Sequence, residues 1–151
     1  MARSESIVGM AASGLTTTDG RRPHVAVVGG TPSGAMVAAV LCEQFGCSAI
    51  SAPTGESVLA LLRRDTPLDM VVIDLSVSDM DGIVAVQLIR ALGARGTLPV
   101  VALTSDRAEI ASTRARAAGF AGAVVKPYSP RELYSAMQTA LARASAGAVS
   151  V

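Results

Sequence analysis

The chain has 151 residues, half of them apolar, and carries 13 basic against 12 acidic residues. This length fits one domain with a full hydrophobic core, and the balanced charge excludes the basic surface of a nucleic-acid-binding or membrane-surface protein. Its apolar runs are too short to cross a bilayer, and its first residues lack the pattern of a signal peptide. We therefore expect a cytoplasmic protein that binds neither nucleic acid nor membrane.

The two ends of the chain differ from its middle in composition. Residues 1–22 are small, polar and aperiodic, and residues 145–151 are small and aperiodic as well. Segments of this kind bury too little apolar surface to fold by themselves. We expect flexible tails over 1–22 and 145–151, with one domain over 23–144 between them.

Short apolar segments alternate with helical patterns in the middle of the chain. Four of the five segments are continuously apolar, which is typical of parallel strands covered on both faces. The segments span 24–28, 47–51, 70–74, 98–104 and 121–125.

Recognisable start and stop signals bound the predicted helices. Thr31 followed by Pro32 is a typical N-cap and first helical residue, and residues 129–132 form a capping box. Further helices are predicted over about 54–64, about 82–94 and from Asp106 to a stop at Gly119. The alternation predicts an α/β fold with a doubly wound, five-stranded parallel sheet and five helices.

Polar side chains end three of the predicted strands. Asp74 ends the third, Thr104 the fourth, and Lys126, the only lysine of the chain, follows the fifth. Ligands of doubly wound sheets bind at the carboxyl ends of the strands. The three residues therefore define the candidate site.

Three segments resemble the receiver domain of bacterial response regulators: LDMVVIDLSVSDMDGIVAVQLIR, LPVVALTSD and AGAVVKPYSP. The spacing of the site residues also resembles the family's, with 30 residues from Asp74 to Thr104 and 22 from Thr104 to Lys126. The resemblance to this CheY-like superfamily covers about residues 23–144. It implies a flavodoxin-like strand order, 2-1-3-4-5, and a role in two-component or phosphorelay signal transduction without enzymatic activity. It also implies a histidine kinase, a phosphotransfer protein or another receiver as partner, and leaves the oligomeric state open.

The resemblance gives each residue of the candidate site a role. Asp74 corresponds to the phosphoacceptor, Thr104 to the hydroxyl and Lys126 to the ammonium that contact the phosphoryl group. The peptide bond from Lys126 to Pro127 is usually cis in the family. The chemistry agrees with these roles, because a carboxylate that attacks phosphorus needs cationic groups around the phosphoryl oxygens.

Two places depart from the family pattern. Family members hold Mg²⁺ with an acidic pair after the first strand, where this chain has Gly29 and Gly30, and they carry a switch aromatic where this chain has Ala123. Mg²⁺ prefers several oxygen ligands, so we expect no firmly bound cofactor, with weak Mg²⁺ binding through Asp74 left open. The hypothesis is an atypical receiver, or pseudo-receiver, with impaired Mg²⁺-dependent phosphorylation.

Two alternative hypotheses remain at this point. The first is a conventional receiver that is switched by phosphorylation of Asp74. The second is a fragment of a dinucleotide-binding, Rossmann-type domain, because Gly29, Gly30 and Gly34 follow the first strand. The dinucleotide fingerprint Gly-x-Gly-x-x-Gly would need a glycine at Thr31, which makes this alternative the weaker one.

The other candidate residues have structural interpretations. Asp79 and Asp81 lie on a loop where the family's acidic residues have no ligand role, and His24 lies at the opposite end of its strand from the site. Cys42 and Cys47 are expected to be two buried thiols rather than a redox pair.

A last expectation concerns partners. Receivers of this family commonly bind partners through the face that corresponds to about residues 107–143 here. Arginines outnumber acidic residues in and beside this stretch. The arginines are Arg107, Arg114, Arg116 and Arg131, and the acidic residues are Asp106, Glu109 and Glu132. We expect this face to bind an acidic or mixed protein surface without phosphorylation.

Overall fold

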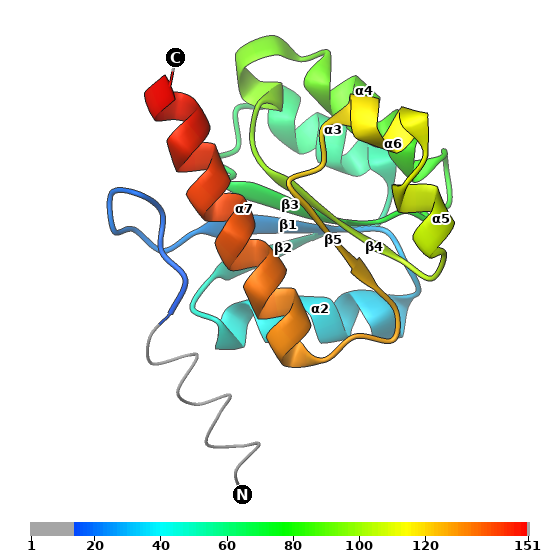
Figure 1. Cartoon of the computed structure of the whole chain (residues 1–151), viewed down its shortest axis with the longest axis horizontal. Helices are drawn as coiled ribbons and strands as arrows, with labels where there is room; N and C mark the ends of the chain where they lie inside the picture. Colours follow the sequence, from blue (N-terminus) through cyan, green and yellow to red (C-terminus); the bar gives the residue numbers. More distant parts are fainter. Residues whose placement is uncertain (1–13, 151) are drawn as a thin grey trace, which may run out of the picture.

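The computed structural model describes residues 14–150, with side chains through residue 144. Parallel strands form one sheet in the order β2-β1-β3-β4-β5, and helices cover both faces of the sheet (Figure 1). The predicted doubly wound fold and strand order are confirmed. The strands are β1 (His24–Val28), β2 (Ser48–Ala52), β3 (Met70–Asp74), β4 (Val100–Thr104) and β5 (Gly122–Val125). The helices are α2 (Pro32–Gln44), α3 (Gly55–Arg63), α4 (Gly82–Arg90), α5 (Arg107–Ile110), α6 (Thr113–Ala118) and α7 (Pro130–Ser150), with a 3₁₀ helix η1 (Gly93–Gly96).

Strands β3 and β4 are buried along their whole length, as expected for apolar strands in the middle of a parallel sheet. Their register pairs Asp74 with Leu103, so the two strands end side by side. Thr104 in turn pairs with Val125, the residue before Lys126. The register alone therefore brings the carboxyl ends of β3, β4 and β5 to one edge of the sheet.

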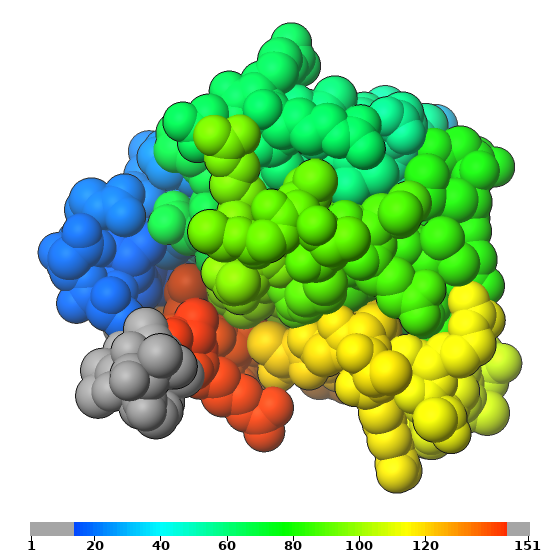
Figure 2. Space-filling model, turned by 90° about the horizontal axis from the view of Figure 1, so that it is seen from above, coloured from blue at the N-terminus to red at the C-terminus, as the bar shows by residue number. Residues whose placement is uncertain are grey.

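Each face of the sheet has its own hydrophobic core. On one face, α2 and α7 pack through residues such as Phe45, Leu133 and Met137. On the other face, α3, α4 and α6 pack through residues such as Leu59 and Ile89. Figure 2 shows this second layer from above as a continuous surface of green and yellow segments. Burial on both faces explains why the strands are continuously apolar.

The predicted helix starts are confirmed. The Thr31 hydroxyl accepts a hydrogen bond from the Gly34 amide, with Pro32 as the first helical residue. The amides of Ser129 and Glu132 donate to each other's side chains in the capping box of α7.

The helix predicted from Asp106 to Gly119 is two short helices, and this part of the prediction is wrong. Ser112 has an extended backbone, and its hydroxyl accepts a hydrogen bond from the Ala115 amide, so that it starts α6 as a new N-cap. Gly119 ends α6 in the left-handed conformation, as predicted. The helix predicted over 82–94 likewise ends at Arg90, and η1 follows it.

Part of the predicted N-terminal tail belongs to the folded body. Leu15 is only 4% exposed, and its amide donates a hydrogen bond to the Phe45 carbonyl. The packed part of the chain therefore begins before residue 23, whereas residues 1–13 of the predicted tail lie outside the described residues. At the other end, α7 continues through residue 150, across most of the predicted C-terminal tail.

The residues given structural interpretations lie where expected. His24 begins β1, at the amino end of the sheet. Cys42 and Cys47 are buried and not disulfide-bonded, and burial raises the pKa of each thiol to about 12. Within residues 14–150, no helix is both long enough and apolar enough to span a membrane.

Arg90, at the end of α4, connects several chain segments at the amino edge of the sheet. Its guanidinium donates hydrogen bonds to the carbonyls of Gly96 at 2.7 Å and Leu98 at 2.6 Å. It also donates to the carbonyls of Ala118 and Gly119, at the end of α6. Burial lowers the pKa of Arg90, but an arginine keeps its charge at any physiological pH. One side chain thus satisfies carbonyls that end two helices and one loop.

We predict that Arg90→Met lowers the free energy of unfolding by about 2–3 kcal/mol, because buried carbonyls lose a charged donor. Arg90→Lys should recover part of this loss, since an ammonium cannot reproduce the planar fork. Urea unfolding measures the effect. The control is Arg63→Met, which removes an exposed ion pair with Glu56 and should cost less than about 1 kcal/mol. Equal losses in both variants would contradict this role of Arg90.

Candidate functional site

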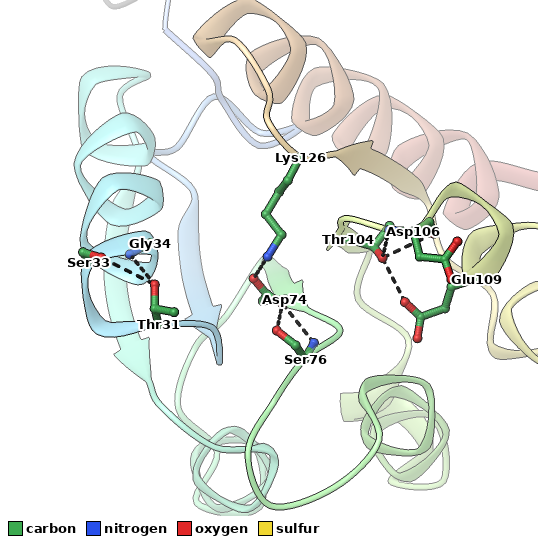
Figure 3. A network of polar contacts seen from close by, with 9 residues as sticks. All are labelled: Thr31, Ser33, Gly34, Asp74, Ser76, Thr104, Asp106, Glu109 and Lys126. Carbon is green, nitrogen blue, oxygen red and sulfur yellow. Dashed lines mark hydrogen bonds and ion pairs between the residues drawn. The ribbon is translucent and has the colours of Figure 1, made fainter.

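Asp74 and Lys126 form an ion pair at the carboxyl edge of the sheet. The Lys126 ammonium lies 2.6 Å from Oδ2 of Asp74 (Figure 3). The Asp74 side chain is 11% exposed and that of Lys126 is 36% exposed, so the carboxylate is buried and the ammonium reaches it from solvent. The peptide bond from Lys126 to Pro127 is cis, as the family resemblance implied.

The second oxygen of the Asp74 carboxylate is also occupied. The Ser76 amide donates to Oδ1 at 2.9 Å, and the Ser76 hydroxyl donates to the same oxygen at 2.5 Å. Burial raises the pKa of Asp74, but the hydrogen bonds from Lys126 and Ser76 outweigh it and hold the pKa below its usual value. Asp74 is therefore ionised at neutral pH, with both oxygens already engaged.

Thr104 lies at the same edge but points elsewhere. Its hydroxyl donates a hydrogen bond to Oε1 of Glu109 at 2.9 Å and accepts one from the Asp106 amide at 3.0 Å. Figure 3 shows Thr104 turned toward Glu109 and away from Asp74. The structure brings Asp74 and Lys126 together, as predicted, but directs the Thr104 hydroxyl away from them.

The loop after β1 passes close to Asp74 and adds no side-chain ligand. Gly29 and Gly30 have φ angles of 73° and 81°, in the left-handed region that favours glycine. A Cβ on Gly30 would lie 3.0 Å from Oδ2 of Asp74, and one on Gly29 would lie 2.3 Å from Cγ1 of Val77. The backbone conformation therefore favours glycine at both positions, and a Cβ on Gly29 would in addition clash with Val77.

The nearby acidic residues have other partners. The Asp79 carboxylate accepts hydrogen bonds from the amides of Gly55 and Glu56 at the start of α3, and these bonds lower its pKa. Asp81 caps α4 by accepting from the Ile83 amide, and it pairs with Arg114 at 3.5 Å. Both carboxylates stabilise helix starts. Within the described residues, no group of three or more metal-ligating side chains is close enough together to hold an ion.

A cavity of about 710 Å³ opens beside the ion pair. Asp74 and Lys126 lie on its wall, together with Thr31 at the start of α2. The rest of the wall is largely apolar and comes from α2 and the loop after β5, including Val37 and Tyr128. The ion pair is thus accessible from one side, between two apolar surfaces.

A second hollow, the β5 groove, lies along the edge strand. It has a volume of about 510 Å³, between β5 and α7. Residues 121–125 form one wall, with Ala123 in the middle, and Ser135 and Thr139 of α7 contribute to the other. Arg107 and Arg143 also line the groove. Ala121, Gly122 and Ala123 add little side-chain volume to the strand side of the groove.

Sequence reasoning missed two residues of this edge. Ser76 follows Asp74 by two positions, where a serine can hydrogen-bond a preceding carboxylate locally, so the spacing was a usable signal. The second is Glu109, which no feature of the sequence pattern connected with the candidate site. Its contact with Thr104 joins the end of β4 to the first turn of α5, five residues further along the chain.

The response regulator receiver domain family matches residues 25–138, more than half of the chain. An uncharacterized 14.6 kDa protein from Leptolyngbya boryana is 33% identical over 98 residues, covering 65% of this chain and 74% of that protein. The sensor protein GacS of Pseudomonas syringae pv. syringae is 28% identical over 116 residues, which cover 75% of this chain but only 13% of GacS. The chain belongs to the receiver domain family, whose members act in two-component signal transduction.

Solved structures agree with this assignment at the level of the fold. The chemotaxis response regulator CheY4 of Vibrio cholerae superimposes with a TM-score of 0.69 at 22% identity, covering 78% of this chain and 97% of that one. The N-terminal domain of a three-domain response regulator from Carboxydothermus hydrogenoformans gives a TM-score of 0.74 at 22% identity, covering 83% and 98%. The family and the strand order favour a receiver over the dinucleotide-binding alternative.

We predict that Lys126→Met raises the pKa of Asp74, because burial then acts against fewer opposing hydrogen bonds. In the wild type, the lowered pKa contributes stability that is present above the unfolded value, about 3.9, and is lost as pH falls through the folded value. The variant should lose about 1–2 kcal/mol at neutral pH and less in acid. A carbon NMR titration of the Asp74 carboxyl, with urea unfolding against pH, measures both effects.

The double variant Lys126→Met with Asp74→Asn is the control for this pair. Without the carboxylate, loss of the ammonium should add no pH dependence between about pH 2 and 6. An unchanged Asp74 pKa in Lys126→Met would contradict the pairing.

Proposed function

We propose that the chain is an atypical receiver domain that signals through protein contacts, and in which Mg²⁺-dependent phosphorylation of Asp74 is impaired. The observation that carries this proposal is the loop after β1. Gly29 and Gly30 supply no carboxylate, and Gly30 approaches Asp74 so closely that a Cβ would lie 3.0 Å from its Oδ2. The ammonium of Lys126 supplies the positive charge at the Asp74 carboxylate instead.

The residues at this edge fit Mg²⁺ poorly. Mg²⁺ needs near-octahedral oxygen coordination and is usually held by one or two carboxylates together with phosphate oxygens. Asp74 is a single carboxylate whose two oxygens already accept hydrogen bonds from Lys126 and Ser76. Asp79 is committed to the start of α3. Weak binding through Asp74 is the most that this arrangement supports.

The other properties follow from the family. Receiver domains work with histidine kinases and phosphotransfer proteins, and the relatives of this chain include sensor kinases. We propose the same classes of partner here, or another receiver, for a cytoplasmic, non-enzymatic module. A conventional phosphorylated switch is the second candidate function, and the contact of Lys126 with Asp74 favours it, because this ammonium is placed to neutralise a phosphoryl oxygen.

The first test is a Mg²⁺ titration followed by amide chemical shifts, together with labelling by acetyl phosphate followed by mass spectrometry. We expect no saturation at sub-millimolar Mg²⁺ and far less than one phosphoryl group per chain. A phosphoryl group adds about −1.5 to −2 charge, and Lys126 alone offsets only part of it. Stoichiometric labelling that disappears in Asp74→Ala would favour the conventional switch.

Two variants separate the missing carboxylate from the shape of the loop. Gly30→Ala should lower stability by about 1–3 kcal/mol, because a non-glycine residue is strained at this φ, and should leave Mg²⁺ binding weak. Gly30→Asp should carry a similar cost but strengthen Mg²⁺ binding relative to Gly30→Ala. If both variants bind Mg²⁺ equally, position 30 is not where a carboxylate would act.

The β5 groove is the surface through which we propose that partners bind. It lies on the face expected from the sequence, and Ala123 leaves it hollow. Arg107 and Arg143 line it together with a single acidic residue, Glu132, whereas Arg114 pairs with Asp81 of the loop before α4. The charge that would recognise an acidic or mixed partner surface therefore comes from Arg107 and Arg143 rather than from Arg114.

We predict that Ala123→Tyr and Arg107→Glu each weaken partner binding about tenfold or more, a loss of about 1.4 kcal/mol or more, whereas Asp74→Ala leaves it nearly intact. Calorimetry with purified histidine kinases and phosphotransfer domains of the same organism measures this. Ala123→Ser and Arg64→Glu are the matched controls, since they keep the groove open and reverse an exposed charge elsewhere. Loss of binding in Asp74→Ala alone would identify a phosphorylation-type switch instead.

A further inference from the structure

The hydroxyl of Thr104 has a single proton, and this proton is committed. It is donated to Oε1 of Glu109 at 2.9 Å, with the Asp106 carbonyl as a more distant acceptor at 3.4 Å. Thr104 is 4% exposed and Glu109 is half-buried, so the bond is partly sheltered from water. A hydroxyl that donates to a carboxylate makes a stronger bond than one that donates to a neutral group. While this bond persists, Thr104 cannot donate to any group attached to Asp74.

Glu109 is held in place by its own backbone. Its amide donates to the Asp106 carbonyl, and its carbonyl accepts from the amide of Ser112. The Ser112 hydroxyl adds a bond to the same carbonyl at 2.8 Å and also caps α6. Ser112, at the break between α5 and α6, therefore holds the backbone carbonyl of Glu109 through two hydrogen bonds.

The same short helix carries a residue of the β5 groove. Arg107 is the first residue of α5 and lines the groove. Its position follows from that of α5, which is tied to β4 through Glu109 and Thr104. In contrast, the Asp74 carboxylate makes its hydrogen bonds to Lys126 and Ser76 and none to α5.

We propose that Glu109 is a positioning residue that takes the proton of Thr104 in place of a phosphoryl oxygen, and so holds α5 and the rim of the β5 groove in one conformation without phosphorylation. This inference rests on the proposed function. It adds the interaction that would keep the β5 groove in the conformation that binds a partner. The Glu109 carboxylate is then a permanent anionic acceptor for the hydrogen bond that the Thr104 hydroxyl donates.

The test uses the full chain without partner or phosphodonor. We expect Glu109→Gln to raise the hydrogen-exchange rates of amides 106–112 about tenfold, because a charged acceptor is replaced by a neutral one. Thr104→Val should raise the same rates, and Glu109→Gln should add nothing further in the Thr104→Val background, since the two residues act as one unit. Thr104→Ser, which keeps the hydroxyl, should stay near the wild type.

Glu43→Gln makes the same chemical change on an exposed side chain of α2 and should leave exchange in 106–112 unchanged. The proposal is overturned if Glu109→Gln matches Glu43→Gln, or if the effects of Glu109→Gln and Thr104→Val simply add. Neither result would affect the binding measurements on the β5 groove, so failure of this inference is distinguishable from failure of the proposed function.

Discussion

The Asp74 carboxylate lies at the end of a strand that is covered on both faces, and its charge is balanced there by Lys126, whose ammonium is 2.6 Å away. A buried carboxylate without such a partner would be strongly unfavourable. The pair also connects β3 to the loop after β5, two strands away, because the register of the parallel sheet ends these strands at one edge. Each oxygen of the Asp74 carboxylate has a close neighbour. Ser76 donates hydrogen bonds to one oxygen, and the backbone of the loop after β1 approaches the other.

Thr104 belongs to the same edge but to a different set of contacts. Its bond to Glu109 joins it to α5, whereas Lys126 and Ser76 donate to the buried carboxylate of Asp74. The Lys126 ammonium thus binds one carboxylate, Asp74, and the Thr104 hydroxyl binds another, Glu109. In the family, the corresponding two groups contact one phosphoryl group. Under the proposed function, this division is the physical reason why partner binding would not need phosphorylation of Asp74.

The fold was predictable because its signals are local. Continuous apolar strands, a Thr-Pro helix start and the Ser129 capping box each depend on a few neighbouring residues, and all were found where expected. Asp74 and Lys126 could be paired because both follow strands of one sheet. The break at Ser112 was not predictable, since its helix-starting bonds compete with an otherwise helical pattern. The orientation of Thr104 depends on its contact with the Glu109 side chain, and the burial of Leu15 depends on a distant partner, Phe45.

The backbone of the loop after β1 also has an evolutionary consequence. A codon for glycine can become one for aspartate through a single base change, but at positions 29 and 30 the new side chain would meet a left-handed backbone and close neighbours. A descendant that gained a carboxylate at either position would therefore lose stability in the same step. The two glycines thus couple any gain of a carboxylate at this edge of the sheet to a loss of fold stability.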